Sequence, residues 1–394
     1  MFEITQKVQS FSDELKELRR YFHRHPEIGF AEFNTQKKII AYLKDLGLHP
    51  NPIAGTGVVA TIEGTKPGRT VLLRSDMDAL PVFEETGLAY ASESPGIMHA
   101  CGHDGHMAML LVASRIIFSL REQFSGTVKI LFQPNEEDAG AWKVIEDGVM
   151  LDPKVDAVFG MHLWSQCATG SVDIVDGPQM AASYYFNLTV NGRGGHAGFA
   201  HKSIDPIYVS TLIIQAIQGI QTRQVDALDP AAIMITKIQA GTSSTIIPEK
   251  VEIEGSIRFL YPEGEKLLER FETVIDQICK AYDATYELSF QQGNALLSND
   301  PVIAKYARQA AAETVGAEKV SAIHRTMAGE DFSSYLAHAP GAFAFVGIHD
   351  TKKSTVYPHH HPMFDIDEGA LLFGTELFVR TAFKLLDKSL AIAT

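Results

Sequence analysis

The sequence predicts an α/β protein that carries an inserted α+β domain, and three observations support this fold class. Amphipathic helical segments alternate with short apolar runs such as TVLLRSD (70–76) and TVKILFQP (127–134), as in a sheet covered by helices. Later in the chain the pattern changes to a β-α-β-β-α-β order, which is typical of a ferredoxin-like unit. The chain of 394 residues is also longer than one hydrophobic core usually supports. We therefore expect a first domain from 1–179 and 294–394, and a second domain from 180–293.

The first domain should begin with two helices. Apolar residues at helical spacing predict one helix over 3–24, which Pro26 ends, and a second from Asn34 as N-cap to Gly47. The tail is expected to complete this domain because His360 lies there. The remaining elements that we expect are strands at 57–64, 70–76, 127–134, 155–162 and 342–348, and helices at 103–120, 140–147, near 300–315 and from 368 onward.

The second domain is predicted from four apolar or alternating runs and two amphipathic segments. This is the split order of a ferredoxin-like α+β unit, and its length of about 110 residues suits a domain. In chain order the expected elements are strand 184–192, helix 205–221, strands 231–239 and 251–259, helix 265–282 and strand 285–291.

Composition excludes several functional classes. The net charge of −14 leaves no surplus of lysine and arginine for phosphates, so we expect no nucleic-acid partner. The amino terminus has no apolar signal segment and no apolar run is long enough to span a membrane, which predicts a cytoplasmic protein without a membrane partner. Three cysteines, Cys101, Cys167 and Cys279, are too few for a disulfide framework and indicate reduced thiols.

The segment MHACGHDGHM (98–107) concentrates possible metal ligands. Gly102 between Cys101 and His103 permits a tight turn, so both side chains can reach one ion. Thiolate and imidazole ligands suit Zn²⁺, Mn²⁺, Co²⁺ or Ni²⁺ rather than Mg²⁺ or Ca²⁺. Taken alone, the fragment also fits a polar helix start whose histidines are merely solvated or capping residues.

Three other segments strengthen the metal interpretation. Glu136 and Glu137 follow one predicted strand, and His162 is expected to end another, although alone they fit a solvated acidic loop and a structural histidine. Asp76 and Asp78 follow a third strand. Ligands of open α/β sheets bind beyond the carboxyl ends of the strands, so these groups should converge. The run YPHHHPMFDIDE (357–368) should add one ligand and two spare histidines.

Taken together, these motifs resemble the metal-dependent aminoacylase and carboxypeptidase family, in particular its amidohydrolase branch of N-acyl-amino-acid, hippurate and auxin-conjugate hydrolases. The resemblance covers almost the whole chain. It implies a zinc-peptidase-like α/β catalytic domain with an inserted ferredoxin-like lid. The motifs occur in the family's order: HRHPEIGFAE, RSDMDALP, MHACGHDGHM, FQPNEE, GMHLW, GRGGHAGFAH, IIPEKVEIEGSIR, MAGEDF and HHHPMFDIDE.

The resemblance also implies roles for individual residues. It assigns the metal ligands to Cys101, His103, Glu137, His162 and His360. Glu136 is implied as the general base. His196 of the lid is implied to reach the substrate carbonyl, in several relatives from the partner subunit, and the lid is implied to form a homodimer or higher homo-oligomer. The cofactor is a divalent metal, Zn, Mn, Co or Ni, as one ion or as two per subunit.

Further positions are weighed for supporting roles. Arg258 is a candidate for a substrate carboxylate, and a surface ion pair is equally compatible with its sequence context. Asp76, Asp78 and Asp104 are candidates for orienting ligand histidines. The chemistry of Glu330 in MAGEDF stays open. Ala200 and Thr245 stand where relatives often have proline and asparagine, at positions that the resemblance places around the substrate rather than the metal.

We therefore expect a metal-dependent hydrolase that cleaves N-acyl amino acids to a carboxylic acid and a free amino acid. As a hypothesis, Glu136 takes a proton from metal-bound water and passes it to the departing amine. The alternatives are a metallo-carboxypeptidase or dipeptidase and a non-catalytic metal-binding protein, against which Glu136 argues. The zinc deaminase pattern P-C-x-x-C and the serine hydrolase pattern G-x-S-x-G are absent from the sequence.

Overall fold

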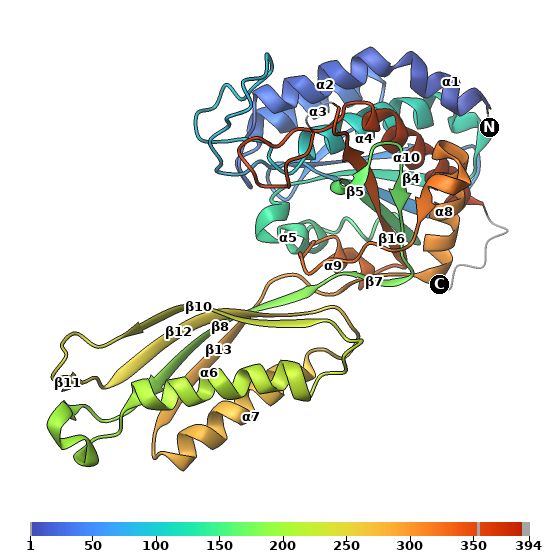
Figure 1. Cartoon of the computed structure of the whole chain (residues 1–394). Helices are drawn as coiled ribbons and strands as arrows, with labels where there is room; N and C mark the ends of the chain where they lie inside the picture. The colour runs from blue at the N-terminus through green and yellow to red at the C-terminus, as the bar shows by residue number, and fades with distance from the viewer. Residues whose placement is uncertain (1, 353–354, 388–394) are drawn as a thin grey trace. The chain divides into compact units, whose positions relative to one another are not determined.

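The chain forms two compact units in a computed structural model that describes residues 2–352 and 355–387 (Figure 1). The expected insert 180–293 lies inside the second unit, which also takes in a short later segment that sequence patterns did not assign to it. The first unit consists of Met1–Gly177, Ser298–His324 and Glu330–Thr394, and the second of Pro178–Leu297 and Arg325–Gly329.

The first unit is built on an eight-stranded mixed sheet in the order β1-β2-β4-β3-β5-β16-β6-β15. Strands β4, β3, β5 and β16 are parallel neighbours, so their carboxyl ends meet at one edge, whereas β2 is antiparallel to β4. The pairing of β16 with β5 brings part of the tail into this sheet. The strands are β1 (Asn51–Ile53), β2 (Gly57–Glu63), β3 (Thr70–Asp76), β4 (Thr127–Gln133), β5 (Ala157–Ala168), β6 (Val172–Asp173), β15 (Val320–Ser321) and β16 (Gly341–His349).

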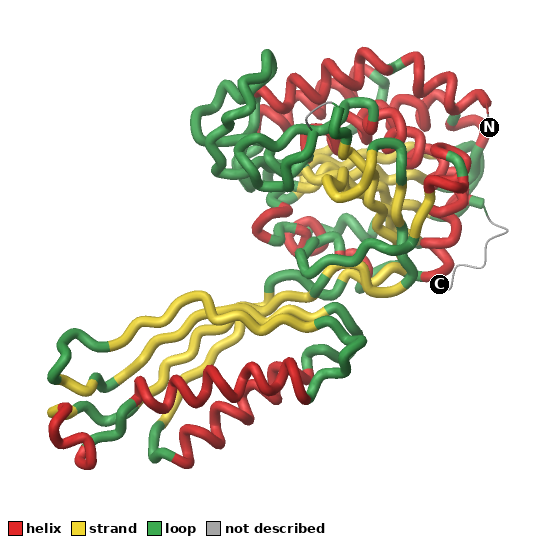
Figure 2. The backbone as a smooth tube through the Cα atoms, viewed as in Figure 1, coloured by secondary structure: helices red, strands yellow, loops and turns green. Residues whose placement is uncertain are grey.

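Helices cover this sheet (Figure 2), and its central strands β3 and β4 are therefore buried along nearly all of their length. The two longest helices of the unit pack against each other at Gly374, where a Cβ atom would lie 2.1 Å from the sulfur of Met109. One large hydrophobic cluster joins helices and strands of this unit. The helices are α1 (Phe2–Ser10), α2 (Ser12–Arg24), α3 (Phe33–Asp45), α4 (His103–Ser119), α5 (Ala141–Glu146), α8 (Pro301–Val315), α9 (Ser333–Leu336) and α10 (Ala370–Leu386), with short 3₁₀ turns η1 (Arg121–Gln123), η2 (Glu136–Asp138) and η4 (Ala317–Lys319).

Two sequence expectations for the first helices were wrong. The helix predicted over 3–24 is two helices, because Phe11 leaves the helical conformation (φ −103°, ψ 13°) between α1 and α2. Asn34 is not the N-cap of α3, since the helix already begins at Phe33. The side chain of Glu27 accepts hydrogen bonds from the backbone N–H of Asn34 at 2.9 Å and of Thr35 at 2.9 Å, which caps the helix from a preceding turn.

The second unit is a four-stranded antiparallel sheet in the order β10-β12-β8-β13, with both of its long helices on one face (Figure 1). This order confirms the ferredoxin-like topology. Phe186, Ile213 and Phe271 lie in its core between sheet and helices. The elements are β8 (Ala182–Asn191), α6 (Pro206–Arg223), β10 (Ala231–Ala240), β12 (Lys250–Phe259), α7 (Lys266–Ala281) and β13 (Thr285–Gln292), with the short elements β9 (Gly195–His196), η3 (Ala197–Lys202) and β11 (Ile246–Ile247). The short strands β7 (Gly177–Met180) and β14 (Leu297–Asn299) span the boundaries between the two units along the chain.

Candidate metal centre

The predicted ligands lie around the carboxyl edge of the first unit's sheet. Glu137 lies in η2, which follows β4, and His103 opens α4. His162 was expected to end its strand, but β5 continues to Ala168, so this histidine projects from mid-strand. The expectation failed because β5 keeps pairing with β16 beyond the residue where the apolar run seemed to stop.

Left-handed backbone conformations shape the two ligand loops. Gly102 adopts φ 93° immediately before α4, which turns the chain sharply between Cys101 and His103. In the acidic loop, Asn135 (φ 56°) and Ala139 (φ 57°) flank η2. Such conformations are uncommon outside glycine and persist where surrounding contacts impose them.

The five predicted ligands form two groups of three that share Cys101. In one group the sulfur of Cys101 lies with His103 and His162, and in the other with Glu137 and His360. Within each group the possible ligand atoms are all within 4.8 Å of one another. The Cys101 sulfur is 3.4 Å from His162 Nε2, and His360 Nε2 is 3.5 Å from Glu137 Oε1.

Orphaned buried atoms in these groups fit a bound cation. His103 Nε2 and Glu137 Oε1 are buried without a hydrogen-bond partner in the described part of the chain. Buried polar atoms are rarely left unsatisfied, and coordination to an ion would satisfy both of these atoms. Burial and the charge of Glu137 raise the pKa of the Cys101 thiol well above its usual range. A divalent cation would counter this and stabilise the thiolate.

Backbone carbonyls fix which nitrogen each ligand histidine presents. His103 Nδ1 donates to the carbonyl of Asp78 at 2.9 Å, and His162 Nδ1 donates to the carbonyl of Leu163 at 2.8 Å. With Nδ1 engaged, each ring presents its Nε2 atom to a possible ion. Burial opposes the charged form of His103, yet the carboxylates of Asp76 and Asp78 raise its pKa to about 10. The electrostatic potential at the centre is thus negative and favours a cation.

Of the three consecutive histidines, the two neighbours of His360 are already engaged. His359 Nε2 donates to the carbonyl of Leu163 at 2.9 Å, and its ring lies 4.8 Å from that of Trp164. His361 stacks on Tyr357 at 4.7 Å and accepts from the backbone N–H of Met363. His360, in a left-handed conformation (φ 66°), is the member that reaches Glu137.

His106, the third histidine of the CGHDGH run, is a structural partner of the centre. Its Nε2 accepts from the backbone N–H of Leu163 at 2.9 Å, so the proton resides on Nδ1, which donates to Asp76 at 2.6 Å. Both ring nitrogens are occupied. Asp76, expected to orient a ligand histidine, thus orients His106, whereas Asp78 touches His103 and also accepts from the backbone N–H of Glu137 at 3.1 Å.

Asp104 does not orient a ligand histidine, contrary to expectation. Its buried carboxylate accepts from Arg19 Nε at 2.8 Å and pairs with His23 Nδ1 at 2.8 Å. The physical reason is helical geometry: Asp104 follows His103 by one residue on α4, so the two side chains point to different sides. Asp104 instead anchors the start of α4 to α2.

A buried charge network around Arg74 was not anticipated from the sequence. The Arg74 guanidinium donates to Asp76 at 2.7 Å, to Asp331 at 2.8 Å and to Gln133 at 2.8 Å, and it lies 3.0 Å from Glu330. This gives Glu330 of MAGEDF a place beside Arg74. The available sequence signal was an arginine inside the otherwise apolar strand TVLLRSD, a residue type that is rarely buried unless paired.

Glu136 lies between this network and the ligand groups. Its carboxylate is within 4.8 Å of the carboxylates of Glu330 and Asp331, and 4.0 Å from His103 Nε2. Burial, followed by the charges of Glu330 and Glu137, raises the pKa of Glu136 well above its usual range. A carboxyl group so placed can hold a proton beside the ligands and release it.

The two predicted site residues of the second unit lie in different parts of it. His196 is exposed in β9, which pairs with β11, and its Nδ1 accepts from the backbone N–H of Gly198 at 3.0 Å. Arg258 lies in β12, and its guanidinium donates to the carbonyl of Met327 at 2.9 Å. Their roles toward a substrate stay predictions.

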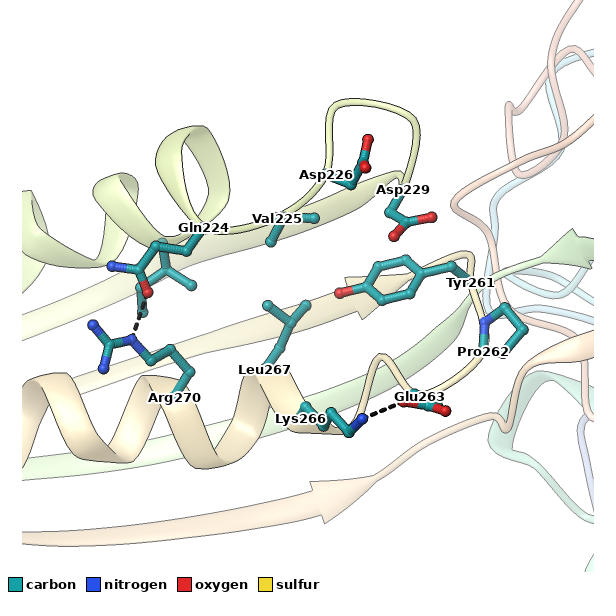
Figure 3. Close-up of a pocket in the computed structure, with 11 residues that line it drawn as sticks. Gln224, Val225, Asp226, Asp229, Tyr261, Pro262, Glu263, Lys266, Leu267 and Arg270 are labelled. Atoms are coloured by element: carbon teal, nitrogen blue, oxygen red, sulfur yellow. Dashed lines mark hydrogen bonds and ion pairs between the residues drawn. The ribbon is translucent and has the colours of Figure 1, made fainter.

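A hollow of about 390 Å³ in the second unit lies where α6 ends and α7 begins (Figure 3). Several of its polar side chains have partners, since Arg270 donates to Gln224 at 2.5 Å and Lys266 pairs with Glu263. Asp226 accepts from the nearby backbone N–H of Leu228. Its lining thus differs in kind from the unsatisfied thiol, imidazole and carboxylate atoms of the metal centre.

Fold and site together define a metal-dependent hydrolase of the amidohydrolase type, with a catalytic α/β sheet and an inserted α+β unit. Residues 72–384 match the model of peptidase family M20/M25/M40, and the chain belongs to this family. None of the helices in the described ranges is both long and apolar enough to cross a membrane.

Curated and solved relatives match nearly the full chain. It is 38% identical to thermostable carboxypeptidase 1 of Saccharolobus solfataricus, over 97% of this chain and 98% of the relative. It is 39% identical to the N-acetyl-L-cysteine deacetylase of Bacillus subtilis, over 97% and 90%. A solved Bacillus subtilis structure, described as a dinuclear metal binding peptidase from the M20 family, has a TM-score of 0.85 at 34% identity and covers 96% of this chain and 99% of its own.

Proposed function

We propose that the protein hydrolyses the amide bond of N-acyl amino acids and releases a carboxylic acid and a free amino acid. The observation that carries the proposal is Glu136, a buried carboxyl group beside the metal ligands but outside both groups that share Cys101. A storage or structural site needs no such group. Relatives named N-acetyl-L-cysteine deacetylase and IAA-amino acid hydrolase, at 39% and 34% identity, support this substrate class.

Two divalent cations per chain are part of this proposal, with Zn²⁺, Mn²⁺, Co²⁺ and Ni²⁺ as candidates. His103 and His162 would hold one ion and Glu137 and His360 the other, with the sulfur of Cys101 common to both groups. Thiolate and imidazole donors favour these borderline metals over Mg²⁺ and Ca²⁺. When bound, such ions polarise a carbonyl oxygen and acidify water.

Glu136 would carry the proton through the reaction. Its carboxylate accepts a proton from the attacking water and, once neutral, donates that proton to the nitrogen of the departing amino acid. The surrounding carboxylates of Glu330 and Glu137 favour the protonated form after the first transfer. Burial of Glu136 keeps bulk water from taking the proton first.

The second unit is proposed to act as a lid with a role in dimerisation. An exposed imidazole such as His196 can donate to an oxyanion, and Arg258 offers a guanidinium for a substrate carboxylate. Both assignments rest on the family resemblance of GRGGHAGFAH and IIPEKVEIEGSIR.

The test is release of free amino acid from a panel of N-acetyl amino acids, hippurate and dipeptides, measured on protein reconstituted with each candidate metal. Turnover of N-acyl amino acids above that of dipeptides supports the proposal. A carboxypeptidase is the second candidate, because the relative from Saccharolobus solfataricus carries that name at 38% identity. Preferential cleavage of peptides from the carboxyl end would favour it instead.

A further inference from the structure

Glu32 is a buried carboxylate that neither the metal ligands nor Glu136 account for. It ends the motif HRHPEIGFAE and is 0% exposed. Its Oε1 accepts from the backbone N–H of Asn135 at 3.0 Å, and its Oε2 accepts from the hydroxyl of Thr56 at 2.5 Å. Asn135 immediately precedes Glu136. Glu32, from a distant part of the chain, therefore accepts a hydrogen bond from the residue that precedes the proposed general base.

Asn135, the residue bonded by Glu32, begins the acidic loop 135–140, and its backbone conformation needs support from other contacts. Asn135 is left-handed (φ 56°, ψ 46°), and its carbonyl accepts from the N–H of Gly140 at 2.7 Å to close the loop. A non-glycine residue holds this conformation only where contacts impose it. The bond from the Asn135 N–H to the buried Glu32 side chain is a contact of that kind.

The segment that carries Glu32 packs against Asn135 and is also hydrogen-bonded to the loop that follows β3. A Cβ atom at Gly29 would lie 1.8 Å from the Oδ1 atom of Asn135, so a larger residue would displace the Asn135 side chain. Ile28 forms a parallel bridge with Ala79, and the N–H of Ala79 donates to the carbonyl of Glu27 at 2.8 Å. The segment thus braces the loop after β3 and the loop after β4 at once.

We propose that Glu32 is a positioning residue that holds Asn135 left-handed and thereby aims the side chains of Glu136 and Glu137. It acts through the backbone N–H of Asn135 and not through the substrate. The inference rests on the proposed function for its kinetic readout. Its structural readout does not depend on any activity.

The experiment compares acceptorless and acceptor-retaining variants of Glu32. Glu32→Met preserves the shape and removes the acceptor, with Glu32→Ala as a second acceptorless form, whereas Glu32→Gln keeps one oxygen for Asn135. Glu27→Ala is the matched control, because Glu27 caps α3 in the same segment but does not bond Asn135. Hydrogen exchange of a peptide covering 133–141 and kcat on N-acetyl amino acids are measured for each variant of the full-length metal-loaded protein.

We expect the acceptorless variants to exchange faster in this peptide and to lose kcat by about 10- to 100-fold, as for other residues that orient metal-site groups. Glu32→Gln should restore both readouts, and Glu27→Ala should change neither, even if its melting temperature falls. Wild-type protection of the peptide in Glu32→Met, or equal kcat losses in Glu32→Gln and Glu32→Met, would overturn the proposal. If the wild type cleaves none of the substrates, the proposed function fails, while the exchange data still decide the role of Glu32.

Discussion

The metal centre of the first unit and the sheet of the second unit use charged side chains in opposite ways. Around the centre, Arg74, Asp76 and Glu330 are buried and make short bonds that fix one another. On the second unit, Lys237 pairs with Glu254 at the surface, where both side chains remain about half exposed. Buried pairs are costly to break and geometrically exact, whereas surface pairs contribute little. The chemistry should therefore tolerate change in the second unit's surface and not around the centre.

The largest effect is expected for the proposed general base, Glu136, compared with an exposed glutamate. Glu136→Gln removes the proton carrier while keeping the shape, and we expect kcat to fall by about 10²- to 10⁴-fold with metal content unchanged. Steady-state kinetics and metal analysis on the same preparation measure both. Glu146→Gln, an exposed glutamate on α5, is the control and should keep full activity. Full turnover by Glu136→Gln would show that another group carries the proton.

A second prediction addresses the buried network. Arg74→Met leaves Asp76, Glu330 and Asp331 without their cation, and loss of one partner from a buried pair costs about 3–5 kcal/mol of the free energy of unfolding. Urea denaturation measures it. Arg20→Met is the matched control, because Arg20 pairs with Glu368 while remaining 43% exposed, and should cost about 1 kcal/mol or less. Equal losses in the two variants would remove the contrast between buried and surface pairs.

The pH dependence of stability gives a third prediction. Burial raises the pKa of Glu32 to about 7, despite the opposing hydrogen bond from Thr56, so folding favours the neutral form. Its contribution to stability is complete below the unfolded-state pKa of about 4.5 and is lost as the pH rises toward 7. Glu32→Gln cannot ionise, so its stability relative to the wild type should increase by ~3 kcal/mol between about pH 5 and about pH 8. Thermal or urea unfolding of both proteins is measured at the two pH values. The same difference in the free energy of unfolding at both pH values would refute the prediction.

The smallest effect is expected on the second unit. Lys280→Ala removes the partner of Asp276, four residues earlier on α7, from a largely exposed pair. Such helical pairs contribute about 0.3–0.5 kcal/mol, so the midpoint of urea unfolding should barely move and kcat should stay unchanged. A loss above about 2 kcal/mol would mean that surface pairs of this unit matter as much as the buried ones.

The sequence predicts those parts of the fold and site that local patterns encode. Strand β3 follows from the apolar run TVLLRSD, and the approach of Cys101 to His103 follows from the intervening glycine. Asp104 was misassigned because its partners Arg19 and His23 lie about 80 residues away on α2, and spacing within MHACGHDGHM carries no information about them. Glu32 was missed for the same reason, since Asn135 lies about 100 residues further along the chain. Packing, not periodicity, decides which distant side chain meets a loop.

The central proposal is that His103 and His162 would hold one cation and Glu137 and His360 another, with Cys101 a member of both groups. Anomalous X-ray diffraction from crystals grown with Mn²⁺ tests it most directly. Our account predicts two anomalous peaks, each at bonding distance from the Cys101 sulfur. Peaks that all lie away from Cys101, His103 and Glu137 would contradict it.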